Sequence, residues 1–291
     1  MSRVRIRTHP DLYRYRDEIR RLDPDQDYER IYQRQALYDF PFDTRIGLNL
    51  AFYRTFAIPE IAELLVRTGQ FTGHAMKRSY DTGLVMYELI AAGFDAPRGR
   101  EMVRLLNRVH HRWDIPNDQY RYVLTAFTVT PTRWLAAHGW RTITSNEREG
   151  VTRFYSELGR RMRIPDPPST YADACAVLDQ YEAAHLAPSS AGATLVAATL
   201  PILADQLPQK LRPHAAHVLS AMFDDADLAH GLGLPRPKRA LARTLTLAMS
   251  VRNWRRRREP PATESWFEPG RTGSQMYPDG YNLSNLGPDE M

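Results

Sequence analysis

A histidine on the apolar face of a helical segment is the first candidate for chemistry. Residues 98–113 repeat apolar side chains at helical spacing, and His110 follows Leu106 by four positions on the same stripe. We therefore expect its imidazole to point toward the core, where a neutral ring nitrogen can ligate a metal ion. A core histidine satisfied by a hydrogen bond is the commoner arrangement, so His110 alone does not decide between the two.

An arginine and a threonine head the apolar stripe of the preceding helical segment. Arg78 and Thr82 are four residues apart and share a face with Met86. A buried arginine requires an anionic partner, because an unpaired buried charge is too costly to keep. That partner is either a carboxylate from another helix or an anionic ligand, with Arg78 on its charge and Thr82 as a hydrogen-bonding side chain.

These residue types suit a haem site without establishing one. An apolar helical pocket with an inward histidine can bind the iron, and the two propionates need arginine-like donors. Arg252, close to the end of a long helical segment, is a further candidate for a propionate contact. Cys175 could in principle supply a haem thiolate, but its Ala-rich surroundings favour a small buried packing residue.

The elements that must position these residues are helices. Helical spacing of apolar residues occurs in nearly every segment and alternating strand patterns are scarce, so the fold class is predicted to be all-α. Thr144 and Glu147 have the spacing of a capping box, and Pro131 is expected at the first position of a helix. We expect helices at about 44–68, 75–93, 98–113, 116–127, 144–162, 170–186, 191–206, 210–223 and 236–257.

The short connections favour one compact helical domain over residues 22–261. An extension over 1–21 precedes this domain, and a tail rich in Pro and Gly follows it over 262–291. The tail keeps the aromatic residues Trp266, Phe267, Tyr277 and Tyr281, which suit docking onto the domain, although a mobile tail fits the composition equally well.

An ordered series of short motifs carries a family resemblance. The motifs are Leu22-Asp23-Pro24-Asp25, Tyr38-Asp39-Phe40-Pro41-Phe42-Asp43, Tyr53-Arg54-Thr55-Phe56-Ala57-Ile58-Pro59, Lys77-Arg78-Ser79-Tyr80-Asp81-Thr82, Asn107-Arg108-Val109-His110, Ile115-Pro116-Asn117-Asp118-Gln119-Tyr120, Pro131-Thr132-Arg133-Trp134, Gly139-Trp140-Arg141 and Glu157-Leu158-Gly159-Arg160-Arg161-Met162. In this order they resemble the rubber-oxygenase catalytic-domain family, on its branch of small oxygenases similar to the membrane-bound enzyme of mycophenolic acid biosynthesis.

The resemblance implies a haem b cofactor in a globin-like helical core, with O2 as co-substrate to oxidise or cleave a hydrophobic unsaturated substrate such as an isoprenoid or lipid. His110 matches the proximal haem ligand, and Arg78 and Thr82 match an element beside the haem. Arg112 stands where the closer branch has an arginine. In the rubber-cleaving members an arginine follows the histidine by four, and this chain has Asp114 there. Their lysine before the threonine is replaced by Asp81.

Composition bounds the alternatives. The chain has 39 basic and 34 acidic residues, a formal net charge of +5, and all but three of its basic residues are arginines scattered along the sequence. A nucleic-acid footprint would cluster, so no nucleic-acid partner is expected. We see no signal peptide and no transmembrane segment, and the single cysteine excludes an internal disulfide. We expect a cytoplasmic protein, with peripheral membrane contact and oligomeric state left open.

Two other functions remain in competition with the oxygenase. One is a catalytically silent member that keeps the fold for binding haem or another ligand. The other, suggested only by the basic charge, is a nucleic-acid-binding protein whose duplex binding would weaken steeply with added salt.

Overall fold

The computed structural model describes residues 9–223, 225–271 and 276–288. These residues form helices and loops and contain no strand, which confirms the all-α prediction. The α-helices are α1 (Arg14–Ile19), α2 (Tyr28–Gln33), α3 (Pro41–Phe56), α4 (Pro59–Arg67), α5 (Gln70–Ala92), α6 (Pro97–His110), α7 (Asn117–His138), α8 (Ser145–Arg161), α9 (Tyr171–His185), α10 (Ser190–Asp205), α11 (Ala215–Met222), α12 (Ala226–Gly231) and α13 (Arg239–Arg256). A π-helix η1 (Arg34–Asp39) and two 3-10 helices, η2 (Gln209–His214) and η3 (Leu283–Asn285), complete the described elements.

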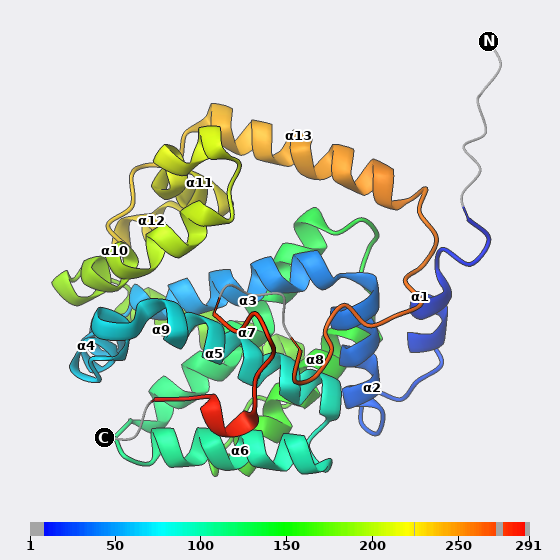
Figure 1. Ribbon diagram of the computed structural model, residues 1–291, viewed down its shortest axis with the longest axis horizontal. Helices are drawn as coiled ribbons and strands as arrows, with labels where there is room; N and C mark the ends of the chain where they lie inside the picture. Colours follow the sequence, from blue (N-terminus) through cyan, green and yellow to red (C-terminus); the bar gives the residue numbers. More distant parts are fainter. Residues whose placement is uncertain (1–8, 224, 272–275, 289–291) are drawn as a thin grey trace.

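Helix α7 is the centre of the molecule. It packs along α3 and also contacts α8 and α9, and Figure 1 shows α3 and α7 crossing the middle of the view. Helices α5 and α6 lie below this pair, and α13 forms the upper edge (Figure 1). The globin-like arrangement of the core stays a prediction.

Two helix boundaries differ from the sequence-based expectation. The segment 44–68 divides into α3 and α4 at Pro59, because the residue before a proline is driven toward extended backbone, and Ile58 has φ −101° and ψ 110°. The helix expected to start at Pro131 does not exist, since Pro131 lies inside the continuous α7. Tertiary packing decides this: Gly47 of α3 meets Pro131 so closely that a Cβ on Gly47 would lie 2.4 Å from the proline Cα.

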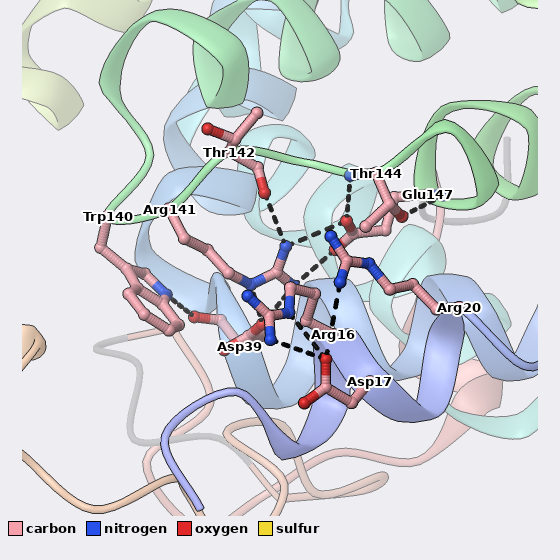
Figure 2. A network of polar contacts seen from close by, with 9 residues as sticks. All are labelled: Arg16, Asp17, Arg20, Asp39, Trp140, Arg141, Thr142, Thr144 and Glu147. Atoms are coloured by element: carbon pink, nitrogen blue, oxygen red, sulfur yellow. Dashed lines mark hydrogen bonds and ion pairs between the residues drawn. The ribbon is translucent and has the colours of Figure 1, made fainter. Parts of the chain in front are cut away.

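The capping box at the start of α8 is confirmed, and it belongs to a buried ion network. Thr144 accepts a hydrogen bond from the Glu147 backbone N–H, and the Glu147 carboxylate accepts one from the N–H of Thr144. Figure 2 shows Arg141 between Asp39 and Glu147, donating to both carboxylates. Burial raises the pKa of Asp39 to about 6, although Arg141 opposes this, because one guanidinium serves two buried acids.

A second buried ion pair ties α3 to α9. The Arg54 guanidinium donates to both carboxylate oxygens of Glu182, at 2.7 and 2.5 Å. The Tyr122 hydroxyl of α7 donates to the same carboxylate at 3.0 Å. These three buried side chains fix α9 against the central pair of helices, so much of the arginine surplus in the sequence is structural.

The described parts of both terminal segments pack on the domain. In the extension, of which residues 1–8 lie outside the described residues, Leu12, Tyr15 and Ile19 are buried. In the tail, of which residues 272–275 and 289–291 lie outside them, Phe267 and Tyr281 are buried. Residues 276–288 of the tail, coloured red in Figure 1, run across α5 and α6.

No single helix among the described residues is long and apolar enough to cross a membrane. Within the described part of the chain, α9 and α10 are the one pair that together has the length and composition for it, and they are bent by 117° at the break between them.

Candidate functional site

A largely apolar cavity of about 210 Å³ lies between α5, α6 and α7. Its apolar wall comes from six helices and the segment after α8. The apolar lining residues include Phe52, Ile61, Leu64, Leu65, Val85, Met86, Leu105, Leu106, Val109, Val123, Leu124, Phe127, Leu158, Met162 and Ile164. The polar lining residues include Thr55, Arg78, Asp81, Thr82, His110, Gln119, Tyr120 and Tyr155.

A second, wider hollow of about 440 Å³ lies near α1 and α2, and charged side chains that include Glu18 and Arg30 line it. Glu18 accepts hydrogen bonds from Arg30 at 2.7 Å and from Arg34 at 3.1 Å. The hollow is open to solvent and polar, whereas the cavity beside α6 is apolar with a few converging polar groups. The latter has the character of a small-molecule site.

His110 enters the cavity as the last residue of α6 in a defined tautomer. Its Nδ1 lies 2.7 Å from the carbonyl oxygen of Leu106, which can only accept, so Nδ1 carries the proton and Nε2 keeps a free lone pair. Burial lowers the pKa of His110, and the nearby positive charge of Arg78 adds to this, while the Leu106 hydrogen bond opposes it. The ring is therefore neutral at pH 7, the state in which imidazole ligates a metal.

Arg78 lies in the same cavity without a carboxylate on its guanidinium. It donates to the Thr82 hydroxyl, which in turn donates to the Arg78 carbonyl at 2.7 Å, and its guanidinium lies 5.3 Å from the Phe71 ring centroid. Within the described residues, no acidic side chain forms an ion pair with Arg78. Burial lowers its pKa, and only the charge of the neighbouring Asp81 opposes that effect. Arg78 is thus a desolvated cation facing an open space, which suits an anionic ligand.

Asp81 joins the cavity wall to the C-terminal tail. Only 1 % of its surface is exposed, and its carboxylate accepts hydrogen bonds from Lys77 at 2.8 Å, Tyr277 at 2.6 Å and the Gly287 N–H at 3.0 Å. Gly287 and Pro288 are themselves part of the cavity wall. The tail therefore closes one side of the site, and Asp81 holds it there.

The structure brings together three of the five predicted site residues. His110, Arg78 and Thr82 share the cavity. Arg112 lies two residues beyond the end of α6 and is exposed, and it is not among the described residues that line the cavity. Arg252 lies on α13, where it donates to both carboxylate oxygens of the buried Asp43. A propionate contact by Arg252 does not fit this position, because its guanidinium is already paired.

Sequence reasoning missed part of the cavity wall. Asp81 stood inside a recognised motif, and its place between Arg78 and Thr82 was the available signal. Gly287 and Pro288 carried no signal, because they are distant in sequence and of common type. Tyr87, the neighbour of Met86, stacks on Phe267 of the tail at a ring-centroid distance of 5.3 Å. Cys175, expected to be buried, is partly exposed and packs beside α4 and α7.

Residues 44–254 match the family model described as "ER-bound oxygenase mpaB/B'/Rubber oxygenase, catalytic domain". The chain belongs to this oxygenase family. The match runs from the first turn of α3 to nearly the end of α13, and so it contains every predicted site residue.

Curated relatives share about a quarter of their aligned residues with this chain. It is 26% identical over 219 residues to the ER-bound oxygenase mpaB of Penicillium roqueforti (strain FM164), covering 69% of this chain and 74% of the relative. It is also 26% identical over 219 residues to the ER-bound oxygenase mpaB' of Penicillium brevicompactum, covering 69% of this chain and 52% of that relative. The chain thus spans about three quarters of one relative and about half of the other.

Proposed function

We propose that the chain is a haem b-dependent oxygenase that uses O2 to oxidise or cleave a hydrophobic unsaturated substrate. The observation that carries the proposal is the pairing, in one apolar cavity, of a neutral histidine with a free Nε2 and a partly buried arginine that, among the described residues, has no carboxylate partner. A haem needs these two things from a protein, one ligand for the iron and a cation for its propionates.

The residues of the cavity fit this group in donor chemistry. Within the described residues, no three His, Cys, Asp or Glu side chains converge as metal ligands, so a metal held by His110 needs ligands from outside the protein. A porphyrin supplies four of them. His110 would hold the iron through Nε2, and its Nδ1 hydrogen bond to Leu106 fixes the ring orientation. Arg78 would hold a propionate.

The remaining side chains of the site bind and orient the substrate. When bound, haem supplies the binding and activation of O2. The aliphatic and aromatic wall excludes water and takes up an isoprenoid- or lipid-like chain. The Thr82 hydroxyl, held between the Arg78 side chain and carbonyl, can donate a hydrogen bond inside the cavity if its bond to the carbonyl is exchanged. The Asp81 anchor keeps the tail closed over the substrate.

The visible spectrum of the purified protein tests the proposal. We expect a Soret band in protein from haem-replete cells and its loss in the His110→Ala variant. The matched control is His111→Ala, since His111 is the adjacent histidine and is exposed on the surface. Colourless wild-type protein that also fails to bind added haem would refute haem dependence. Bound haem without O2-dependent turnover of any alkene would favour the catalytically silent member of the family.

A further inference from the structure

Helix α13 is an unusual element because it buries so little of itself. None of its eighteen residues, all of which the structure describes, is fully buried. It lies along the upper edge of the molecule in Figure 1, far from α6 on the lower edge. The helix therefore has one face that packs on the domain and a larger face that is exposed.

One face of α13 anchors the helix. Met249 packs against the core cluster formed by α3, α10 and α11. Arg252 forms a bidentate ion pair with the buried carboxylate of Asp43, and Asn253 donates to the carbonyl of His138 at 2.9 Å. These residues follow one another at helical spacing, so the helix is fixed in rotation and its opposite face is fixed toward solvent.

The opposite face carries an apolar stripe. Leu247, Val251 and Trp254 recur at intervals of four and three residues, and they are 65%, 45% and 52% exposed. Three large apolar side chains on one exposed helical face form a contiguous patch, and such a patch marks an interaction surface more often than isolated exposed residues do.

The surroundings of this stripe are strongly cationic. From Arg236 to Arg258 the sequence holds nine basic residues and no acidic one. Exposed arginines lie at both ends of the stripe, namely Arg243 before it and Arg255 and Arg258 after it. Cations at the end of a helix stabilise it, but those at its start oppose the helix dipole, so helix stability does not account for Lys238 and Arg239.

We propose that the outward face of α13 binds an anionic lipid surface. Apolar side chains including a tryptophan, flanked by arginines on an otherwise polar face, are the pattern of a helix that lies in the membrane interface. Arg243, Arg255 and Arg258 pair with lipid phosphates and carboxylates, and Leu247, Val251 and Trp254 enter the acyl boundary. Nucleic acid would match the charge but leave the apolar stripe without a partner. This inference is independent of the haem proposal, because α13 is remote from the cavity.

Vesicle co-sedimentation of the full chain tests the inference. We expect binding to phosphatidylcholine vesicles that contain about a quarter phosphatidylserine, and little binding to pure phosphatidylcholine. The variant Leu247→Ser/Val251→Ser/Trp254→Ser should bind at least about tenfold more weakly. Neutralising Arg243, Arg255 and Arg258 to Gln should weaken binding by about fivefold per residue and remove most of its salt dependence. Met76→Ser, at an exposed methionine on α5, is the control and should bind as the wild type does.

Fluorescence locates the contact within the helix. Trp254 is expected to shift to shorter wavelength on addition of the anionic vesicles in a Trp266→Phe background, because Trp266 is the other exposed tryptophan. Circular dichroism, unchanged in every variant, excludes loss of the fold. The inference is overturned if the triple serine variant binds as the wild type does, if neutral vesicles bind equally, or if the protein binds no vesicles and instead forms a dimer that the serine substitutions abolish. Duplex DNA binding that survives the serine substitutions, without vesicle binding, overturns it as well.

Discussion

Replacing Arg78 with methionine should stabilise the haem-free protein while weakening its hold on haem. In the haem-free state the guanidinium is desolvated, and among the described residues no carboxylate pairs with it. Removing an ion from water costs several kcal/mol in a protein. The Thr82 hydrogen bond offsets about 1 kcal/mol of this cost, and the contact with the Phe71 ring offsets about 0.5–1 kcal/mol.

The balance predicts a gain of about 1–3 kcal/mol in the free energy of unfolding of haem-free Arg78→Met, since methionine fills the same space without a charge. Haem affinity should fall about 10- to 100-fold, because a charge-assisted hydrogen bond of about 1.5–3 kcal/mol is lost. Urea unfolding followed by circular dichroism measures the first quantity, and haem titration at the Soret wavelength measures the second.

The control for this substitution is Arg104→Met. Arg104 is an exposed residue of α6 that pairs with the half-exposed Glu101 at 3.2 Å, so the change should move either quantity by no more than about 0.5 kcal/mol. The two effects of Arg78→Met have opposite signs, and this makes the test strict. A destabilised haem-free protein with unchanged haem affinity would show that Arg78 is an ordinary structural arginine, and the anionic-ligand interpretation would fail.

Three further predictions concern the buried residues Asp39, Asp81 and Gly99. Burial raises the folded-state pKa of Asp39 to about 6, so protonation of Asp39 stabilises the fold below about pH 4, and this contribution is lost as the pH rises to 6. The Asp39→Asn variant lacks this titration, so its free energy of unfolding relative to wild type should rise by about 1–3 kcal/mol between pH 4 and pH 7. A difference that does not change with pH would contradict the raised pKa of Asp39. Asp81→Asn should speed proteolysis and hydrogen exchange of residues 276–288 and lower the free energy of unfolding by about 2–3 kcal/mol, because three donors face this carboxylate. The control Asp279→Asn, at an exposed residue of the same segment, should leave proteolysis and exchange unchanged. Gly99→Ala should destabilise the protein by more than about 3 kcal/mol in thermal unfolding, since its Cβ would lie 1.7 Å from the Gly93 carbonyl oxygen, and Gly83→Ala, where a Cβ meets open space, should instead be neutral or stabilising by about 0.5 kcal/mol.

Much of the site was predictable because it is local. His110, Arg78 and Thr82 were placed on inward helical faces by their spacing to apolar residues, and the structure puts all three in one cavity. Arg252 was not predictable in this way. Its sequence position at a helix end says nothing about Asp43, which lies far away in the chain and takes up its guanidinium.

The predicted helix boundary at Pro131 was wrong because a tertiary contact overrode the local preference of the residue. Pro131 is a strong start signal by itself, yet α7 continues through it because α3 packs against that turn at Gly47. The capping box at Thr144 succeeded because both of its hydrogen bonds form within four residues.

The sequence by itself determined the helical class, the inward direction of His110 and Arg78, and the preference for arginine over lysine. These properties depend on spacing along one helix and on side-chain chemistry, and neither of these depends on contacts with residues distant in the sequence. Only the tertiary structure decided which arginines are paired. Arg54, Arg141 and Arg252 each meet a carboxylate from another part of the fold, while Arg78 meets a cavity. Whether a buried charge is structural or available for a ligand is a property of its neighbours in space, and the order of residues does not contain those distances.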